Sequence, residues 1–172
     1  IGSVPMAYLI ARIVRGIDIR QYGSGNVGSS NVWHTVGRVW IVPIGLFDFL
    51  VKGPSSVIIA AHLLDLNTQA QVVAGLTTIV GHNWPIFLGF KGGRGVAPTI
   101  GVLLVLARLE LTASLVVTFV GWRLTKSSAP GVLIAALLLP GWSLLLGRPT
   151  PIVVLMLGIV IINILKRLLA NG

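Results

Sequence analysis

The sequence predicts an all-α integral membrane protein with seven short transmembrane helices. Of its 172 residues, 55% are hydrophobic and only 10% are charged, and the mean hydropathy is +0.94. A soluble domain has about 25% charged residues, so this chain has too few polar side chains to cover a soluble fold of its size. The apolar residues also fall in long runs between short polar stretches, which is typical of helices that cross a bilayer.

The apolar runs give the expected spans in chain order. Residues 1–14 would rise only about 21 Å as a helix, short of a hydrocarbon core of about 30 Å. We therefore expect the first helix to be truncated and to continue upstream of residue 1. The later runs predict spans over residues 40–64, 69–90, 131–146 and 151–165, with the 69–90 span loosening near Pro85.

Residues 96–122 could form one long helix or two short ones. Arg108 and Glu110 lie near the centre of this run. An unpaired charge at the middle of a bilayer is costly, which favours two short helices with a turn at residues 107–110. In that arrangement Arg108 and Glu110 are expected at the far interface.

The charge distribution predicts the topology. With two short helices in residues 96–122, the N-terminus lies outside and the C-terminus in the cytoplasm. Only Arg108 and Arg148 then fall on the outer side, as the positive-inside rule requires. Ten basic residues share the cytoplasmic side: Arg12, Arg15, Arg20, Arg38, Lys91, Arg94, Arg123, Lys126, Lys166 and Arg167.

Composition excludes several classes of function. The net charge of +9 comes from basic residues scattered between apolar runs, whereas a nucleic-acid surface needs a basic face on a soluble fold. We therefore expect no nucleic-acid partner. The chain has no cysteine, which rules out a disulfide framework, a thiolate nucleophile and a cysteine metal site.

The most informative polar stretch is GHNWPIFLGFKGGRG at residues 81–95. Its last five residues, 91–95, precede an apolar helix that is predicted to begin near residue 96. Glycines let the backbone turn tightly and approach a ligand, and a helix N-terminus presents free N–H groups to an anion. Lys91 and Arg94 add charge that a phosphate can use. The stretch predicts a phosphate site, and a plain cytoplasmic loop with a glycine turn is the alternative.

A second glycine-rich stretch, GSGNVGSSN at residues 23–31, matches GxGxxG and has Asp48 20 residues beyond it. A dinucleotide site needs a soluble βαβ unit, whereas Asp48 lies in an apolar run. The stretch is instead suited to wrapping a small polyol, with a solvated turn as the alternative. Its occurrence on the same membrane face as residues 81–95 favours one shared site. The polar side chains belong to Ser24, Asn26, Ser29, Ser30 and Asn31.

Two further sets of polar residues carry weaker signals. Asp48 and Lys52 are spaced i, i+4 in the order that favours an ion pair. We expect them to neutralise each other and to hold the loops, and direct catalysis is the alternative. His34 and His82 could each be a base, a phosphate donor or an interfacial residue. Their spacing predicts no metal site.

Together these loops resemble those of the bacterial acyl-phosphate:glycerol-3-phosphate acyltransferases, the PlsY family. The similarity begins with IGSVPMAYLIARIVRGIDIR, continues through GSGNVGSSN and an Asp followed by Lys-Gly, and includes GHNWPIFLGFKGGRGVAPTIG. The resemblance covers nearly the whole chain. It implies one transmembrane acyltransferase domain over residues 1–172, in the inner (plasma) membrane of a bacterial cell, with the active site facing the cytoplasm.

The resemblance also implies a reaction in phospholipid synthesis. A fatty acyl group would pass from acyl phosphate to the sn-1 hydroxyl of glycerol 3-phosphate, giving lysophosphatidate and phosphate, with no cofactor or metal. The implied partners are these two substrates and membrane lipid. An activated donor needs mainly positioning and charge stabilisation, so Ser24 is expected to be a substrate ligand and not an acyl-carrying nucleophile. The predicted catalytic residues are Ser24, Arg94 and His34, and the predicted substrate-binding residues are Asn26, Asn31, Lys91, Gly92, Gly93, Gly95, Ser128 and Asn163.

The chain departs from the family pattern at several positions. His34 stands where the family has Arg, and a histidine keeps a donor without the permanent charge of an arginine. Arg94 stands where the family has Lys, so a compact ammonium group is replaced by a planar guanidinium group with several N–H donors. The family has a His-Arg-x-Asn run near its C-terminus, and in this chain only the Asn has a counterpart, Asn163. In the third loop, where the family has two serines, this chain offers Ser127 and Ser128. These changes bear on activity more than on the fold.

Two alternatives follow from these departures. A non-catalytic paralogue that binds phosphate-bearing lipid precursors, or a partner subunit of another lipid enzyme, would lose an Arg and a His-Arg pair in this way. A small anion transporter would instead favour broken helices that meet at the middle of the membrane. Here the polar loops gather at one face, which favours the acyltransferase or its inactive relative.

Overall fold

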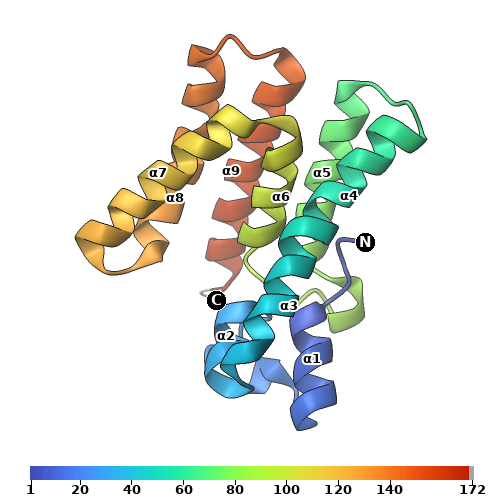
Figure 1. The fold of residues 1–172 in the computed structure, drawn as a ribbon, viewed down its shortest axis with the longest axis vertical. Coiled ribbons are helices and arrows are strands. Elements are labelled where there is room, and N and C mark those ends of the chain that lie inside the picture. Colours follow the sequence, from blue (N-terminus) through green and yellow to red (C-terminus); the bar gives the residue numbers. More distant parts are fainter. Residues whose placement is uncertain (171–172) are drawn as a thin grey trace.

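A computed structural model describes residues 1–170 of the chain, and over these residues the protein is built of helices without strands (Figure 1). This confirms the predicted all-α class. The helices are α1 (Met6–Arg15), α2 (Ser29–Thr35), α3 (Ile41–Leu46), α4 (Gly53–Ile58), α5 (Thr68–Asn83), α6 (Val96–Leu106), α7 (Arg108–Thr125), α8 (Ser128–Leu145) and α9 (Thr150–Ala170).

Helices α3 and α4 belong to one continuous helix over Arg38–Leu63. It widens to π geometry over Phe47–Lys52 and again over Ile59–Leu63. Pro54 cannot donate the backbone hydrogen bond that an α-helix needs, which favours a wider turn just before it. Such π turns occur often at functional sites, and this one carries two buried charged residues, Asp48 and Lys52.

The predicted break in residues 96–122 is confirmed. Helix α6 ends at Leu106 and α7 begins at Arg108, with Ala107 between them in a non-helical conformation (φ −154°, ψ 62°). The Glu110 side chain is fully buried within the protein. Arg148, in the loop between α8 and α9, pairs with it and neutralises the charge.

Helix α2 lies between residues 14 and 40, where the apolar runs predicted no helix. The helix forms because Val32 is buried against a small apolar cluster that includes Ala11, Ile19, Ile44 and Leu88. This cluster joins α1, α2 and α3 at the lower end of the molecule in Figure 1. It fixes the two glycine-rich loops relative to each other.

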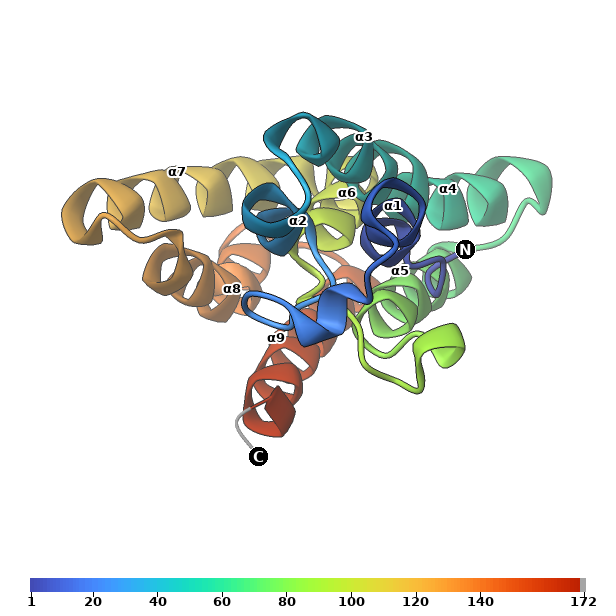
Figure 2. The same cartoon turned by 90° about the horizontal axis from the view of Figure 1, so that it is seen from below.

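The main core lies among α4, α5, α6 and α9 and includes Val57, Ile79, Val102, Leu155 and Met156. Glycine allows a close contact between helices: a Cβ on Gly53 of α4 would lie 2.6 Å from the Pro98 carbonyl oxygen of α6. The α7–α8 hairpin extends to one side of this core (Figure 2).

Length and composition allow two helices to cross a membrane: Arg38–Leu63, with mean hydropathy 1.5, and Thr150–Leu169, with mean hydropathy 2.4. Val96–Leu106 and Ala129–Leu145 are shorter apolar helices. Many large apolar side chains point outward from the helices, among them Leu115, Phe119, Leu137 and Leu157. Lipid is the environment in which such a surface is stable.

Candidate active site

The predicted phosphate loop lies between α5 and α6. Helix α5 ends at Asn83, and a 3₁₀ turn over Ile86–Leu88 leads into the loop. Helix α6 begins at Val96, as expected, with Gly95 as its N-cap in the left-handed conformation (φ +73°). The first amides of α6 have no acceptor within the helix, so they are free to face an anion.

Close packing explains the glycines of this loop. The Gly93 N–H donates to the His82 carbonyl at 3.2 Å, and a Cβ on Gly93 would collide with the His82 ring. A Cβ on Gly92 would lie 2.9 Å from the Asn83 carbonyl oxygen. These glycines are buried, whereas Lys91 and Arg94 are exposed. The loop therefore presses its backbone onto the end of α5 and directs its cations outward.

Asn31 organises the first loop, the glycine-rich stretch of residues 23–31. Its side-chain amide donates to the carbonyls of Ile19, Tyr22 and Asn26 at 3.1, 2.9 and 3.1 Å. Its side-chain oxygen accepts from the Ser24 N–H at 3.1 Å. Because Asn31 is buried and its polar atoms are used within the protein, its visible role is to shape the loop that carries Ser24.

The two loops border one cleft with a volume of about 1050 Å³. Its walls come from the first loop, the phosphate loop and the C-terminal part of α9. Of the predicted site residues, the cleft brings together Ser24, Asn26, Lys91, Gly92, Arg94 and Asn163.

The cleft has a strong excess of positive charge. Among the described residues, Asp18 is its one acidic lining residue, whereas its basic lining residues are Arg20, Lys91, Arg94, Lys166 and Arg167. Arg20 is paired with Asp18, with Nη2 and Oδ2 2.6 Å apart, and it also donates to the Leu88 carbonyl at 3.0 Å. The side-chain hydrogen bond from Arg20 holds the pKa of Asp18 below its usual range. The remaining four cations favour an anionic ligand.

Lys166 ties α9 to the start of the phosphate loop. Its Nζ donates to the Asn83 carbonyl at 2.7 Å and lies 5.4 Å from the centre of the Trp84 ring. The sequence indicated Lys166, Arg167 and Arg20 only as basic residues that end predicted spans. The sequence analysis assigned these residues and the two loops to the same side of the membrane. That shared side was the signal that could have placed them in the site.

An apolar groove of about 140 Å³ runs beside the cleft among α6, α7, α8 and α9. Leu103, Leu111 and Leu139 are among its lining residues. Cleft and groove share three lining residues, Val96, Val132 and Asn163. A ligand with a charged head and an apolar tail could therefore occupy both at once.

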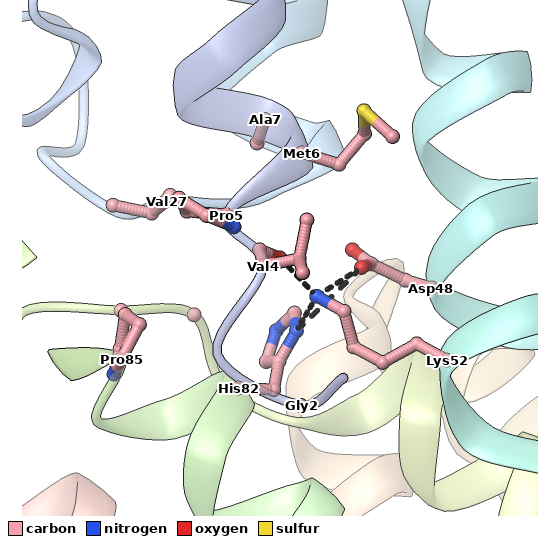
Figure 3. A pocket seen from close by; sticks show the side chains of 12 residues that line it. Gly2, Val4, Pro5, Met6, Ala7, Val27, Asp48, Lys52, His82 and Pro85 are labelled. Atoms are coloured by element: carbon pink, nitrogen blue, oxygen red, sulfur yellow. Dashed lines mark hydrogen bonds and ion pairs between the residues drawn. The ribbon is translucent and has the colours of Figure 1, made fainter. Parts of the chain in front are cut away.

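A buried polar cluster lies behind the phosphate loop (Figure 3). Lys52 Nζ is 2.7 Å from Asp48 Oδ1, which confirms the predicted ion pair. The same ammonium group donates to the Val4 carbonyl at 2.7 Å and lies 3.2 Å from His82 Nδ1. The role of His82, left open by the sequence, is thus that of a member of this cluster.

Several predicted site residues lie outside the cleft lining. His34 is exposed on α2, Asn31 is buried behind the first loop, and Gly95 caps α6. Gly93 lines a small cavity beside the buried cluster. Ser128 begins α8, but its side chain falls outside the described part of the structure. The assignments of these residues remain predictions.

Fold and cleft together define a class: a helical protein of the membrane with a cationic cleft that opens into an apolar groove. The family model described as glycerol-3-phosphate acyltransferase matches residues 1–170. The chain belongs to this family, as its loops indicated.

Individual relatives agree with this membership. The chain is 46% identical over 140 residues to glycerol-3-phosphate acyltransferase 5 of Dehalococcoides mccartyi, a match that covers 81% of this chain and 59% of that protein. Two crystal structures of PlsY (YgiH), an integral membrane glycerol 3-phosphate acyltransferase, are similar over 99% of this chain. The glycerol 3-phosphate form has a TM-score of 0.87 and 28% sequence identity, and 84% of its chain is covered. The lysophosphatidic acid form has a TM-score of 0.83 and 27% sequence identity, and 87% of its chain is covered.

Proposed function

We propose that this protein transfers a fatty acyl group from an acyl phosphate to the sn-1 hydroxyl of glycerol 3-phosphate. The observation that carries the proposal is the continuity of the cationic cleft with the apolar groove. Two crystallised relatives, named for forms with glycerol 3-phosphate and with lysophosphatidic acid, support it, since these are the acceptor and the product of such a reaction.

In the proposed complex, the phosphate of glycerol 3-phosphate lies against the phosphate loop. Lys91 and Arg94 supply charge from the exposed side of the loop, and the N-terminus of α6 supplies amides. Ser24 and Asn26 face the same cleft and orient the glycerol hydroxyls. The acyl chain lies in the groove past Val132. Its carbonyl carbon then lies where the groove meets the cleft, at Asn163, which lines both.

The proposed chemistry is direct acyl transfer. The sn-1 oxygen forms an ester bond with the acyl carbon, the bond from that carbon to the phosphate oxygen breaks, and the hydroxyl proton leaves with inorganic phosphate. Arg94 stabilises the charge that develops, and positioning supplies much of the rate. Ser24 acts as a ligand in this scheme: among the described residues, no histidine or carboxylate forms a hydrogen bond to its hydroxyl. His34 completes the proposed catalytic set from the exposed end of α2.

We further propose the topology that the charges predict: one acyltransferase domain over residues 1–172, with seven spans, the N-terminus outside and the cleft on the cytoplasmic face of the inner membrane of a bacterium. The cleft holds Arg20, Lys91, Arg94, Lys166 and Arg167 at one end of the molecule. The α6–α7 and α8–α9 turns lie at the other end (Figure 1). This grouping supports the positive-inside assignment.

The deciding experiment measures phosphate release by purified protein with palmitoyl phosphate and glycerol 3-phosphate. We expect release that requires both substrates, yields lysophosphatidate and is lost in Arg94→Ala. If folded protein releases no phosphate while glycerol 3-phosphate raises its melting temperature, the chain is a non-catalytic binding paralogue. Absence of both release and binding would overturn the proposed site as well.

A further inference from the structure

Lys52 forms the centre of the buried cluster. Its side chain is 1% exposed, and its ammonium group meets Asp48 Oδ1, the Val4 carbonyl and His82 Nδ1. A lysine ammonium can only donate, so the Val4 carbonyl and His82 Nδ1 are its hydrogen-bond partners, while Asp48 Oδ1 forms an ion pair with it at 2.7 Å. The contacts join the N-terminal segment, the π turn and α5 at one point.

This arrangement holds the His82 ring in place. Nδ1 of the ring lies 3.2 Å from the Lys52 ammonium and 3.7 Å from Asp48 Oδ1. Nε2 faces Gly93, where even a single Cβ would collide with it. The His82 carbonyl also accepts from the Gly93 N–H at 3.2 Å. His82 therefore fixes Gly93 with both its ring and its backbone.

The segment Gly92–Gly93 separates this cluster from the cleft. Gly92 lines both the small cavity beside Lys52 and the large cleft, whereas His82 lines only the former. A Cβ on Gly93 would also lie 2.9 Å from the Val27 carbonyl oxygen, so Gly93 is held between His82 and the first loop. Any change in the tilt of the His82 ring must move the phosphate loop.

We propose that Asp48, Lys52 and His82 act as positioning residues that set the phosphate loop for the phosphate of the acceptor substrate. Asp48 neutralises and orients Lys52, Lys52 orients the His82 ring, and the ring supports the loop from behind. The three residues touch no substrate. The proposal rests on the proposed function for the identity of the ligand, but its geometry belongs to the loop alone.

The test compares His82→Asn with His62→Asn. An asparagine oxygen at position 82 can still accept from Lys52, while the ring behind Gly93 is removed. We expect the KM for glycerol 3-phosphate to rise between roughly tenfold and a hundredfold, as for a misplaced binding group. The KM for palmitoyl phosphate and kcat should change less than about twofold. His62 is exposed near the end of the Arg38–Leu63 helix, away from the phosphate loop, and should show no effect.

A second variant follows the path through the cluster. If Lys52 acts through His82, Lys52→Met should raise the KM for glycerol 3-phosphate in the native background and add little in His82→Asn. Should Lys52→Met fail to fold, His82→Asn still decides. A fall in kcat with an unchanged KM for glycerol 3-phosphate, or an equal rise of both KM values with a lowered melting temperature, would overturn the proposal.

Binding separates this proposal from the proposed function. Glycerol 3-phosphate should raise the melting temperature of the native protein, and His82→Asn should lose most of that increase. If the native protein binds glycerol 3-phosphate without turnover, the proposed reaction fails. The positioning role is then still tested by the shift in melting temperature. If His82→Asn retains the full increase, the positioning role fails even where turnover is intact.

Discussion

Glu110 and Arg148 form a two-point ion pair between the start of α7 and the loop that joins α8 to α9. The Nε–Oε1 and Nη2–Oε2 distances are 2.7 and 3.0 Å. The Glu110 side chain is fully buried, whereas that of Arg148 is 30% exposed. The pair holds together the end of the bundle opposite the cleft, so its loss should affect stability before substrate binding.

The unequal burial of this pair predicts unequal mutational effects. Arg148→Met leaves a buried carboxylate without a partner and should destabilise the protein by about 3 kcal/mol. Glu110→Gln leaves an arginine that can still reach solvent, so its cost should be clearly smaller. Thermal unfolding in detergent measures both. An equal loss in the two variants would contradict the asymmetry, and Arg108→Met, at an exposed cation nearby, is the control.

Gly93→Ala should damage the phosphate loop because its Cβ has no space between the His82 ring and the Val27 carbonyl. The backbone must shift by several tenths of an ångström, and we expect the KM for glycerol 3-phosphate to rise at least roughly tenfold. Titration of initial rates measures it. Gly45→Ala is the matched control, since a Cβ there meets no neighbouring atom. Similar KM values in the two variants would argue against close packing as the reason for Gly93.

His34→Arg tests the one predicted catalytic residue that is exposed on α2. A permanent charge with a longer reach should lower the KM for glycerol 3-phosphate by a few-fold, because added positive charge on the protein attracts a dianion. The effect should shrink as ionic strength rises. An unchanged KM at low salt would remove His34 from the substrate site.

The Asp18–Arg20 ion pair in the cleft should stabilise the protein less at acidic pH. Its pKa lies below the ordinary value of 3.8, chiefly because its side chain accepts a hydrogen bond from Arg20. A carboxyl group with a lowered pKa stabilises the fold above its ordinary pKa, and that contribution is lost as the pH falls through the folded-state value. The difference in melting temperature between native protein and Asp18→Asn should therefore be constant above about pH 5 and shrink below about pH 4.

An Asp65→Asn variant is the control for this titration, because Asp65 is exposed. A difference between native protein and Asp18→Asn that stayed constant into strong acid would show that the Asp18–Arg20 pair contributes nothing that titrates.

The sequence predicted the helical class, the break near Ala107 and the start of α6 at Val96, because each has a local cause. Apolar runs set the spans, Arg108 and Glu110 disfavour a continuous helix, and Gly95 favours a helix start. It also predicted the Asp48–Lys52 pair from i, i+4 spacing. Motif similarity identified the family from two loops.

Local patterns did not give α2 or the full lining of the cleft. Helix α2 is too short to form without the cluster around Val32 that buries it. Lys166 reaches Asn83 across 83 positions of the chain, and no spacing rule relates such residues. His82 and Gly93 are likewise joined only because the loop folds back onto the end of α5.

By itself, the sequence determined that this protein consists of apolar helices with two glycine-rich polar loops, since hydrophobic periodicity and backbone chemistry are local properties. Tertiary structure decided which polar residues meet. Packing of the N-terminal segment, α5 and the π turn placed Lys52 between the Val4 carbonyl, His82 and Asp48, and packing of α9 on α5 brought Lys166 to the cleft. Which of many equally polar residues become neighbours depends on how buried helix faces fit, and that is a property of the whole fold.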